Sequence, residues 1–521
     1  MSRSSLSVRD ALLALAIATL ALGIYLRTLA AGLLPGDSGE FQTLASLLGH
    51  THPTGYPIYL ILAKPFTWLP WRDIAWRVNL VSAVMAALTA MGLYLTARLL
   101  TDSALLSLAG ALLLAISPTF WSQARIAEVY TPGAAFLMTI LGLLVWWDVR
   151  NAAWALFLAG LLGGLSLGVH MTVALMAPAG LLFLLLYHRR RWAVARTALA
   201  GAGLGVLLTL MAFWLIDRHN PPANYFHAVI LPSISAWDLT PAALDAPWER
   251  LWFSWSAQQF RPFMGQWQVF GDQAQTFWEH LPQELGAPTP WLALLGGLWL
   301  LGKCFRVGVL ILLALGLQLF FTFTYAIWDL YVFFIPAYGL LTLLAVAGLA
   351  AVADAAVWGV SRWRASRPTW LRPTLTILLA LAFLFLAVWP VFRPNWDAVL
   401  ARENPFQHWE EYPQDDSNLP ILAQLTVDNL PPNAILFTDW DMLWPYYYTA
   451  HVLGRRPDLL FHETYPRDDR PELADSVIES IRQQISTHPI FFSERDARLR
   501  QAGFKLQPRR VGPQRLYQVA P

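Results

Sequence analysis

Long apolar runs recur along the first three-quarters of the chain, and they constrain its fold more than any other feature. Eight runs are long enough to cross a bilayer as helices, which takes about 17 to 25 residues, and three more are shorter. Only 13% of the 521 residues are charged, against about 25% in an average soluble domain. The sequence predicts about eleven transmembrane helices, near residues 10–30, 79–98, 103–117, 132–149, 153–169, 171–187, 194–216, 289–303, 307–325, 331–357 and 370–391.

The first apolar run and the segment after it carry further signals. The run is too long for a signal peptide and lacks a small-residue cleavage site, so we expect a retained helix. Residues 56–71, YPIYLILAKPFTWLPW, form a short apolar segment bounded by prolines, which favours a helix lying at the membrane interface over a span. The single Cys304 leaves no partner for an intrachain disulfide.

Basic residues alternate between successive loops. Because Lys and Arg are retained on the cytoplasmic side, this alternation predicts a cytoplasmic N-terminus. Eleven spans then place the loops 31–78, 118–131, 217–288 and 326–330, together with the C-terminal tail, on the opposite side. The basic residues that set this orientation are Arg3, Arg9, Arg98, Arg150, Arg189, Arg190, Arg191, Lys303, Arg306, Arg362, Arg364, Arg367 and Arg372.

Charge marks a boundary near residue 393. From there to the end lie 14 of the 36 Lys and Arg residues and 18 of the 34 Asp and Glu residues. In this tail a short apolar run, AILF, precedes a predicted helix at PELADSVIESIRQQIS, an alternation typical of a small α/β domain. We expect a transmembrane domain over 1–392 and a small C-terminal extracytoplasmic α/β domain over 393–521, which either recognises an acceptor or covers a cavity.

Most of the unusual polar residues fall in the predicted outer loops. Each has a structural interpretation: Asp37 could cap a helix that begins at Ser38, Glu40 could lie in its first turn, and Arg125 with Glu128 could pair at helical spacing. His170 could hydrogen-bond at the interface. Together on one side of so weakly charged a chain, however, they indicate a functional site. The candidates are Asp37, Glu40, His50, His52, Arg125, Glu128, His170 and Asp329.

An ordered series of motifs then resembles a known family. GDSGEF, HPTGYP, WRVNLVSA, WSQARIAEVY, GLSLGVHMT and DLYVFFIPAY occur in this order. Together they are similar to a family of multispan proteins long labelled only as a domain of unknown function, which is related to protein O-mannosyltransferases within the glycosyltransferase-C (GT-C) superfamily. The resemblance covers most of the chain to about residue 350. Beyond residue 393, TDWDMLWPYYYTAHVLGRRPDLL also resembles the soluble region of that family.

The resemblance implies a GT-C-like fold and a membrane glycosyltransferase. It implies transfer of a sugar, mannose by analogy and with inversion, from a polyprenyl-phosphate donor to an acceptor hydroxyl, such as that of a protein Ser or Thr, on the extracytoplasmic face. Such a site needs a carboxylate to accept the hydroxyl proton and donors to stabilise the departing phosphate. A polytopic transporter or flippase for a lipid-linked sugar and a noncatalytic lipid-binding scaffold are the competing classes. The partners are then the lipid-linked sugar, the acceptor and the bilayer, with no nucleic acid.

The sequence offers residues for each role that this chemistry requires. We expect Asp37 to be the general base, positioned by Glu40 or sharing its proton. Arginine suits bidentate phosphate contact, so Arg125 and Arg261 are candidates for the donor site, although the loop 217–288 that carries Arg261 could instead bind the acceptor. The remaining donor- or substrate-binding candidates are His52, Tyr56, Glu128, His170 and Asp329. Asp37, Glu40, His50 and His52 could in principle bind a divalent ion, but they lack a metal-binding spacing such as HExxH. The resemblance implies a reaction without a metal, so we favour no metal and no cofactor.

Overall fold

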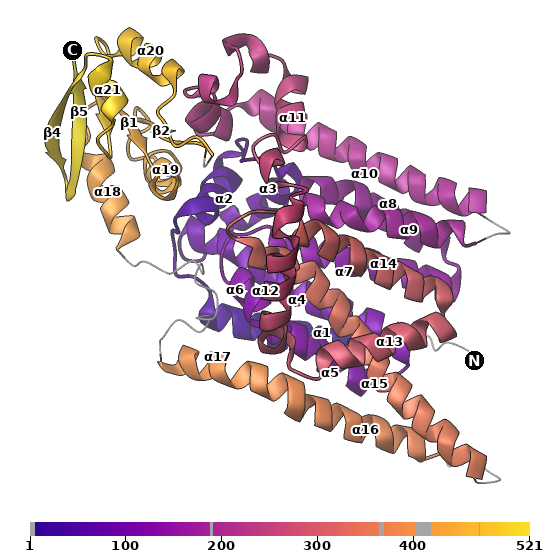
Figure 1. Ribbon diagram of the computed structural model, residues 1–521. Helices are drawn as coiled ribbons and strands as arrows, with labels where there is room; N and C mark the ends of the chain where they lie inside the picture. Colours follow the sequence, from indigo (N-terminus) through magenta and orange to yellow (C-terminus); the bar gives the residue numbers. More distant parts are fainter. Residues whose placement is uncertain (1–5, 188–190, 364–368, 402–417, 468) are drawn as a thin grey trace.

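The structure is a computed structural model that describes residues 6–187, 191–363, 369–401, 418–467 and 469–521. Seven helical segments in this part of the chain are long and apolar enough to cross a membrane. Figure 1 shows them running side by side in one bundle. They are α1 (Val8–Thr28), α4 (Ile74–Thr101), α7 (Tyr130–Arg150), α10 (Arg191–His219), α14 (Phe305–Phe323), α15 (Ile335–Trp363) and the continuous helix formed by α16 (Leu371–Phe383), η10 (Leu384–Val388) and α17 (Trp389–Ala401).

The other four predicted spans coincide with shorter or bent helices. α8 (Ala153–Leu165) and α9 (Ala177–Leu185) are too short to count as full spans. α5 (Ala104–Ile116) bends by 67° into α6 (Pro118–Ala124), and the segment ending in α12 (Phe270–Leu285) bends by 96° into α13 (Thr289–Lys303). Each of the eleven predicted ranges therefore overlaps an apolar helix, but at most nine described segments, counting each bent pair as one, pass the length test for a span.

Small residues allow the closest helix contacts in the bundle. A Cβ atom added to Gly160 of α8 would lie 2.1 Å from the carbonyl oxygen of Ala198 in α10, and one added to Gly164 would lie 2.4 Å from that of Ala202. Only glycine permits such an approach of two backbones. Helix contact thus explains these glycines of the GLLGGLSLG stretch.

Basic residues of different predicted cytoplasmic loops share contacts at one end of the bundle. Arg372 Nε lies 3.0 Å from Asp354 Oδ1, and Lys303 Nζ lies 3.4 Å from Asp354 Oδ2. Arg372 also donates to the carbonyl oxygen of Thr101 at the end of α4, close to Arg98. These contacts bring three of the predicted cytoplasmic loops to one end of the bundle. Arg3, Arg189, Arg190, Arg364 and Arg367 lie outside the described residues.

Several short helices lie at the end of the bundle that faces the C-terminal domain. They include α2 (Gly36–Leu47), α3 (Pro57–Ala63), η1 (Lys64–Trp68) and α11 (Pro247–Trp255). The segment predicted to lie at the interface forms α3 and η1, and Trp68 and Trp71 at its end are exposed. Indole rings suit the membrane–water boundary because they combine an apolar body with a polar N–H group.

The C-terminal domain is a small α/β unit, as the sequence predicts. Its five strands pair in the order β2-β1-β3-β5-β4, with β1 parallel to β2 and β3, and β5 antiparallel to β3 and β4. The predicted boundary at residue 393 falls within α17. The elements are α18 (Leu419–Asn429), β1 (Ile435–Thr438), α19 (Trp440–Tyr447), β2 (Leu460–Glu463), α20 (Asp475–Gln484), β3 (Ile490–Phe492), α21 (Ala497–Gln501), β4 (Lys505–Val511) and β5 (Gln514–Ala520).

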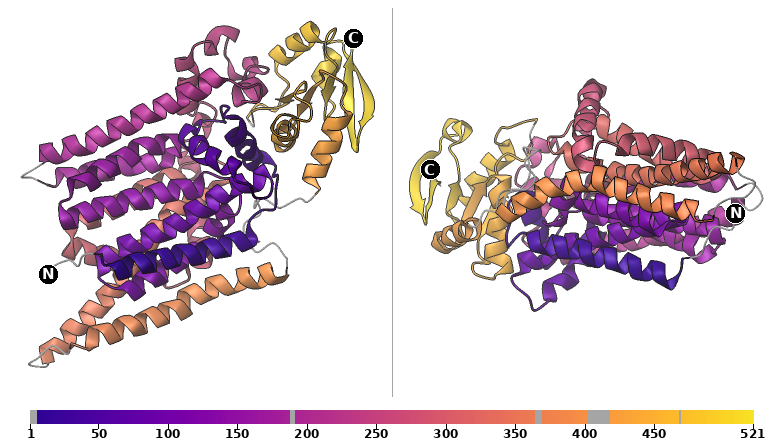
Figure 2. Two further views of the ribbon diagram at one scale, coloured as in Figure 1. Left: turned by 180° about the vertical axis from the view of Figure 1, so that it is seen from behind. Right: turned by 90° about the horizontal axis from the view of Figure 1, so that it is seen from below.

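This domain sits on one end of the helix bundle. Figure 1 shows it beside α2, whereas α1 begins at the far end of the bundle. Both views of Figure 2 show the same separation, and they show the helix formed by α16 and α17 lying along the outside of the bundle. Helix α19 packs on α2, where Thr43 Oγ1 donates to the carbonyl oxygen of Trp444 at 3.2 Å. The structure therefore brings the domain onto the segment that carries GDSGEF.

Candidate functional site

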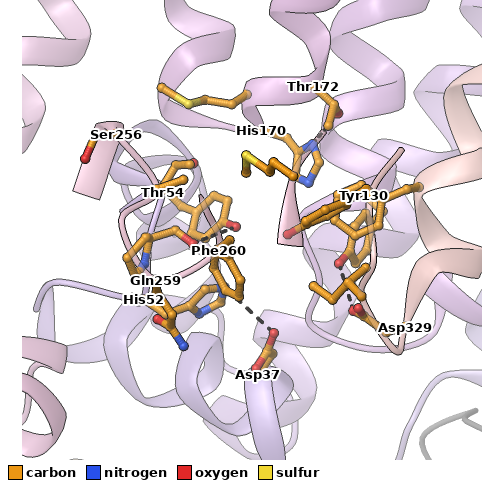
Figure 3. Close-up of a pocket in the computed structure, with 18 of the residues that line it drawn as sticks. Asp37, His52, Thr54, Tyr130, His170, Thr172, Ser256, Gln259, Phe260 and Asp329 are labelled. Carbon is orange, nitrogen blue, oxygen red and sulfur yellow. Dashed lines mark hydrogen bonds and ion pairs between the residues drawn. The ribbon is translucent and has the colours of Figure 1, made fainter. Parts of the chain in front are cut away.

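A cavity of about 510 Å³ opens where the helix bundle meets the C-terminal domain. Its wall combines the loop after α2, the ends of several bundle helices and two segments of the C-terminal domain, and Figure 3 shows how these side chains surround it. The polar or ionisable lining residues are Asp37, His52, Thr54, Tyr56, Tyr130, His170, Thr172, Ser256, Gln259, Tyr325, Asp329, Trp440 and Glu463.

Asp37 lies in the first turn of α2 with its carboxylate at the cavity wall. The helix begins at Gly36 after Pro35, and no side chain caps it, so the prediction that Asp37 caps a helix beginning at Ser38 is wrong. Its Oδ1 atom accepts a hydrogen bond of 2.8 Å from Trp440 Nε1, and its side chain is 41% exposed. Asp37 is therefore available to a molecule in the cavity.

His52 connects Asp37 to a fully buried carboxylate. Its Nε2 atom lies 3.8 Å from Asp37 Oδ2, and its Nδ1 atom lies 2.5 Å from Glu40 Oε2. The backbone N–H of His52 also donates to Glu40 Oε1 at 2.8 Å. Glu40 is the fifth residue of α2, so the prediction that it serves the first turn is wrong. It orients the imidazole from behind the cavity wall.

Charge on these groups follows from their burial and from one another. Burial disfavours the imidazolium form, but the carboxylates of Glu40 and Asp37 outweigh it and raise the pKa of His52 to about 9. Desolvation raises the pKa of Glu40, against the opposing effect of the His52 charge. At neutral pH the pair therefore holds a proton between the two groups, and the positive charge of His52 faces Asp37.

Glu128 is buried behind the cavity wall. Its Oε1 atom accepts a bond of 3.3 Å from Ser38 Oγ, and its backbone N–H donates to Ser82 Oγ at 3.1 Å. Desolvation, with the charge of Asp37 nearby, raises the pKa of Glu128 well above its ordinary value. α6 ends at Ala124 and α7 begins at Tyr130, so the predicted helical spacing of Arg125 and Glu128 is wrong.

A second polar group lies across the cavity from Asp37. Figure 3 shows His170 and Thr172 on the side opposite Asp37, with Tyr130 and Asp329 forming a further wall. His170 Nδ1 lies 2.5 Å from Thr172 Oγ1, and Tyr130 donates to Asp329 Oδ2 at 3.4 Å. Desolvation lowers the pKa of His170 to about 4, so this imidazole is neutral at physiological pH. The predicted candidates His170 and Asp329 thus line the cavity with Asp37, His52 and Tyr56.

The two arginines predicted to hold a phosphate do not line the cavity. Arg125 donates through Nε to the carbonyl oxygen of Thr28 at 3.1 Å. Arg261 is exposed in η7 (Arg261–Phe263), where its Nε donates to the carbonyl oxygen of Ser256 at 3.0 Å. Among the described lining residues there is no Lys or Arg. Imidazole, hydroxyl, indole and the Gln259 amide groups therefore supply the side-chain hydrogen-bond donors of this cavity.

His50 belongs to a separate network outside the cavity lining. Its Nε2 atom lies 2.9 Å from Asp217 Oδ1, and Arg250 binds both oxygens of the same carboxylate at 2.6 and 2.8 Å. His50 thus joins the loop after α2 to α10 and α11.

In the part of the chain that the structure describes, no three His, Cys, Asp or Glu side chains are grouped to hold a metal ion.

Sequence reasoning missed the lining residues that the C-terminal domain contributes. Trp440, Glu463 and Pro466 lie on the cavity wall, together with Gln259 and Phe260 of the long outer loop. Trp440 lies two residues after the carboxyl end of β1, and Glu463 is the last residue of the neighbouring parallel strand β2. Ligands often bind where parallel strands end, and the TDWD stretch after β1 was the available signal.

These features define the class of protein. A multispan helix bundle with an acidic first outer loop, short interfacial helices and a cavity under a soluble domain is the architecture of the GT-C glycosyltransferases. The chain is a multi-pass integral membrane protein of this fold. Two solved structures share it: ArnT from Cupriavidus metallidurans bound to undecaprenyl phosphate (TM-score 0.57, 15% identity, 97% of each chain covered) and the oligosaccharyltransferase AglB from Archaeoglobus fulgidus in complex with an inhibitory peptide and a dolichol-phosphate (0.55, 12%, 92% of this chain and 69% of that one).

Sequence comparison narrows the relationship. Residues 37–196 match the family described as the protein O-mannosyl-transferase TMEM260 N-terminal domain. The protein O-mannosyl-transferase TMEM260 of Mus musculus is 31% identical over 149 residues, and that of Dictyostelium discoideum is 27% identical over 115 residues. These alignments cover 28% and 22% of this chain but only 21% and 14% of the relatives. The predicted resemblance to protein O-mannosyltransferases is confirmed over this region, which includes Asp37, His52 and His170.

Proposed function

We propose that this protein is a membrane glycosyltransferase that moves mannose from a polyprenyl-phosphate donor to the hydroxyl of a protein Ser or Thr. The observation that carries the proposal is the Asp37 carboxylate at the cavity wall, backed by His52 and the buried Glu40. A carboxylate fixed at a cavity wall can accept the proton of a hydroxyl that attacks a sugar. The relatives named O-mannosyltransferases support the choice of reaction.

The reaction we propose is a single displacement. The acceptor oxygen attacks the anomeric carbon while Asp37 takes the hydroxyl proton. The bond between that carbon and the phosphate oxygen breaks, and its electron pair stays with the departing polyprenyl phosphate. Attack from the face opposite the leaving group inverts the configuration at the anomeric carbon. His52, held charged by Glu40, keeps the Asp37 carboxylate directed toward the cavity.

The opposite wall fits the leaving group. Tyr130, His170 and Thr172 offer hydroxyl and imidazole groups to phosphate oxygens, and donors aimed at developing charge are a major source of rate enhancement. Leu175 and Phe321 line the same cavity and suit a prenyl chain. Thr54 Oγ1 is buried at the wall without a hydrogen-bond partner among the described residues, which suits a sugar hydroxyl. We assign Arg261 to the rim, within reach of an incoming donor or acceptor.

The same proposal sets the orientation in the membrane. With a cytoplasmic N-terminus, the cavity and the C-terminal domain face away from the cytoplasm, where a lipid-linked sugar is the available donor. No metal takes part in the proposed reaction. Side chains of the protein supply both the group that accepts the hydroxyl proton and the hydrogen bonds to the departing phosphate.

A transfer assay with purified protein in lipid nanodiscs tests the proposal. Polyprenyl-phosphate mannose and a nucleoside diphosphate mannose are supplied separately, with Ser- and Thr-containing acceptor peptides from secreted proteins. We expect mannosylated peptide only with the lipid-linked donor. Turnover with the nucleotide sugar in lipid-free enzyme would contradict the donor assignment. Movement of intact polyprenyl-phosphate mannose across vesicle membranes without transfer would instead identify a flippase.

A further inference from the structure

We infer that Trp440 is a positioning residue for Asp37, so that the C-terminal domain forms part of the catalytic centre. This inference rests on the proposed function, because it concerns the carboxylate that we assign as the general base. Three features of the structure support it: the hydrogen bond between the two side chains, the packing that fixes the indole, and the docking of α19 on α2.

The hydrogen bond divides the two oxygens of Asp37 between two partners. Trp440 Nε1 donates to Oδ1 at 2.8 Å, whereas Oδ2 lies 3.8 Å from His52 Nε2. An indole N–H group donates but cannot accept, so Oδ1 is committed to the C-terminal domain. The carboxylate is thereby held with Oδ2 on the side of His52. A general base acts only from within hydrogen-bond reach of the proton that it removes. The orientation of the carboxylate therefore affects how well Asp37 can accept the proton of the acceptor hydroxyl.

Packing fixes the indole that makes this bond. The Trp440 ring meets His52 edge-on, with centroids 6.2 Å apart and planes at 83°, and it meets Trp444 at 5.7 Å and 88°. Tyr225 lies against it at 6.1 Å. Edge-to-face contacts of this kind are favourable for aromatic rings. Trp440 therefore touches both His52 and Asp37 from a position set by its neighbours.

Helix α19 reaches Asp37 because its first residue is fixed by a cap and because the helix packs against α2. Asp439 follows β1, and its Oδ1 atom accepts from the backbone N–H of Met442 at 2.9 Å, which caps α19 and makes Trp440 its first residue. On the facing side, a Cβ atom added to Gly39 would lie 3.4 Å from Trp444 Cβ and 2.5 Å from the carbonyl oxygen of Leu34. Glycine is required at position 39 by the close approach of the Leu34 carbonyl just before α2, and Trp444 of α19 meets it at ordinary van der Waals distance.

This arrangement gives the C-terminal domain a direct role in catalysis. A base that is displaced by about 1 Å loses much of its rate advantage. Trp440, which lies 403 positions from Asp37 in the sequence, holds the Asp37 carboxylate in place. Undocking of the domain would free Asp37 Oδ1 and leave the base poorly oriented.

The test is the substitution Trp440→Phe, measured in the nanodisc assay with polyprenyl-phosphate mannose. Phenylalanine keeps an aromatic ring and removes the N–H donor. A hydrogen bond to a charged group contributes about 1.5 to 3 kcal/mol, so we expect kcat to fall about tenfold to a hundredfold. KM for the donor and the acceptor should stay within about twofold, because a positioning residue acts on the chemical step.

A second background separates orientation from packing. In Asp37→Asn, which lacks the base, adding Trp440→Phe should change the residual kcat by less than about twofold, because the two residues act as one unit. The matched control is Trp248→Phe, which makes the same change at an exposed tryptophan of α11 outside the cavity lining. Trp248 takes no part in the contacts that hold Trp440, so kcat per folded molecule should stay near that of the wild type. Trp440→Tyr gives a further measurement in case the phenylalanine variant does not fold.

Distinct outcomes would overturn distinct claims. A Trp440→Phe enzyme with wild-type kcat would show that Asp37 needs no such support. A rise in acceptor KM with kcat unchanged would assign Trp440 to acceptor binding, and an equal loss in the two Asp37 backgrounds would assign it to folding. A wild-type enzyme without transferase activity would refute the proposed function, and this inference with it.

Discussion

The Nδ1 atom of His52 lies 2.5 Å from Oε2 of Glu40, a carboxylate that is wholly buried behind the cavity wall. His52 lies between the buried Glu40 and Asp37. The two acidic residues of GDSGEF therefore differ in their access to the cavity. Asp37 reaches the cavity, whereas Glu40 acts on it through the imidazole. In the reaction we propose, the acidic residue exposed to the cavity, Asp37, is the base, and the buried one, Glu40, orients His52 beside it.

The first prediction concerns the pH dependence of stability. The pKa of His52 is raised from about 6.5 to about 9 in the folded protein. The bound proton therefore contributes stability that is fully present below about pH 6.5 and is lost as the pH rises through about 9. We expect the gap in melting temperature between the wild type and His52→Gln to narrow between these pH values. A gap that stays constant or widens would contradict the assigned charge on His52.

The second prediction separates the His50 network from the chemistry. Arg250→Met leaves the Asp217 carboxylate, whose side chain is 5% exposed, without its bidentate partner. We expect a loss of about 3 kcal/mol of stability, typical of removing one partner of a buried ion pair, with kcat per folded molecule unchanged. The double variant Arg250→Met with Asp217→Asn should recover part of the loss because no buried charge remains. Normal stability with lost turnover would instead place Arg250 in the catalytic machinery.

The third prediction fixes the orientation of the chain. In a Cys304→Ser background, a thiol introduced at the exposed Glu479 of α20 should react with a membrane-impermeant maleimide in intact cells. The matched control is a thiol at the exposed Arg150, which ends α7 and should react only after lysis. The reverse pattern would invert the topology that the basic loops predict.

The fourth prediction concerns metal ions. In the proposed reaction, side chains alone accept the hydroxyl proton and hydrogen-bond the departing phosphate. Enzyme treated with EDTA and exchanged into metal-free buffer should therefore keep its transfer rate. The control is the same enzyme with Mg²⁺ or Mn²⁺ restored. Loss of activity on chelation with recovery on adding either ion would show that the reaction requires a metal.

Hydropathy predicts the helices well because burial in lipid demands long apolar runs, and the eleven predicted ranges all overlap apolar helices. It does not predict where such a run bends. The 67° break between α5 and α6 falls at Ser117 and Pro118, where the buried Glu284 of α12 accepts from Ser117 Oγ at 2.6 Å and Thr119 N at 3.0 Å. That contact joins residues more than 160 positions apart, and no local pattern reports it.

The sequence likewise predicts some residues of the site and not others. Asp37, His52, His170 and Asp329 could be found because ionisable groups are rare in so apolar a chain, and the structure gathers them around one cavity. Chemistry alone favours arginine as a phosphate ligand, yet neither Arg125 nor Arg261 lines the cavity. The sequence does not indicate a role for Trp440 because its partner Asp37 lies in another domain and tryptophan is common in the chain.

The central claim is that Asp37 is the general base, and Asp37→Asn tests it most directly. Asparagine keeps the shape and can still accept from Trp440 Nε1, and α2 has no side-chain cap to lose. We expect transfer from polyprenyl-phosphate mannose to fall by about 10² to 10⁴, with expression, melting temperature and donor binding nearly unchanged. An Asp37→Asn enzyme that retains most of its transfer rate would contradict the account.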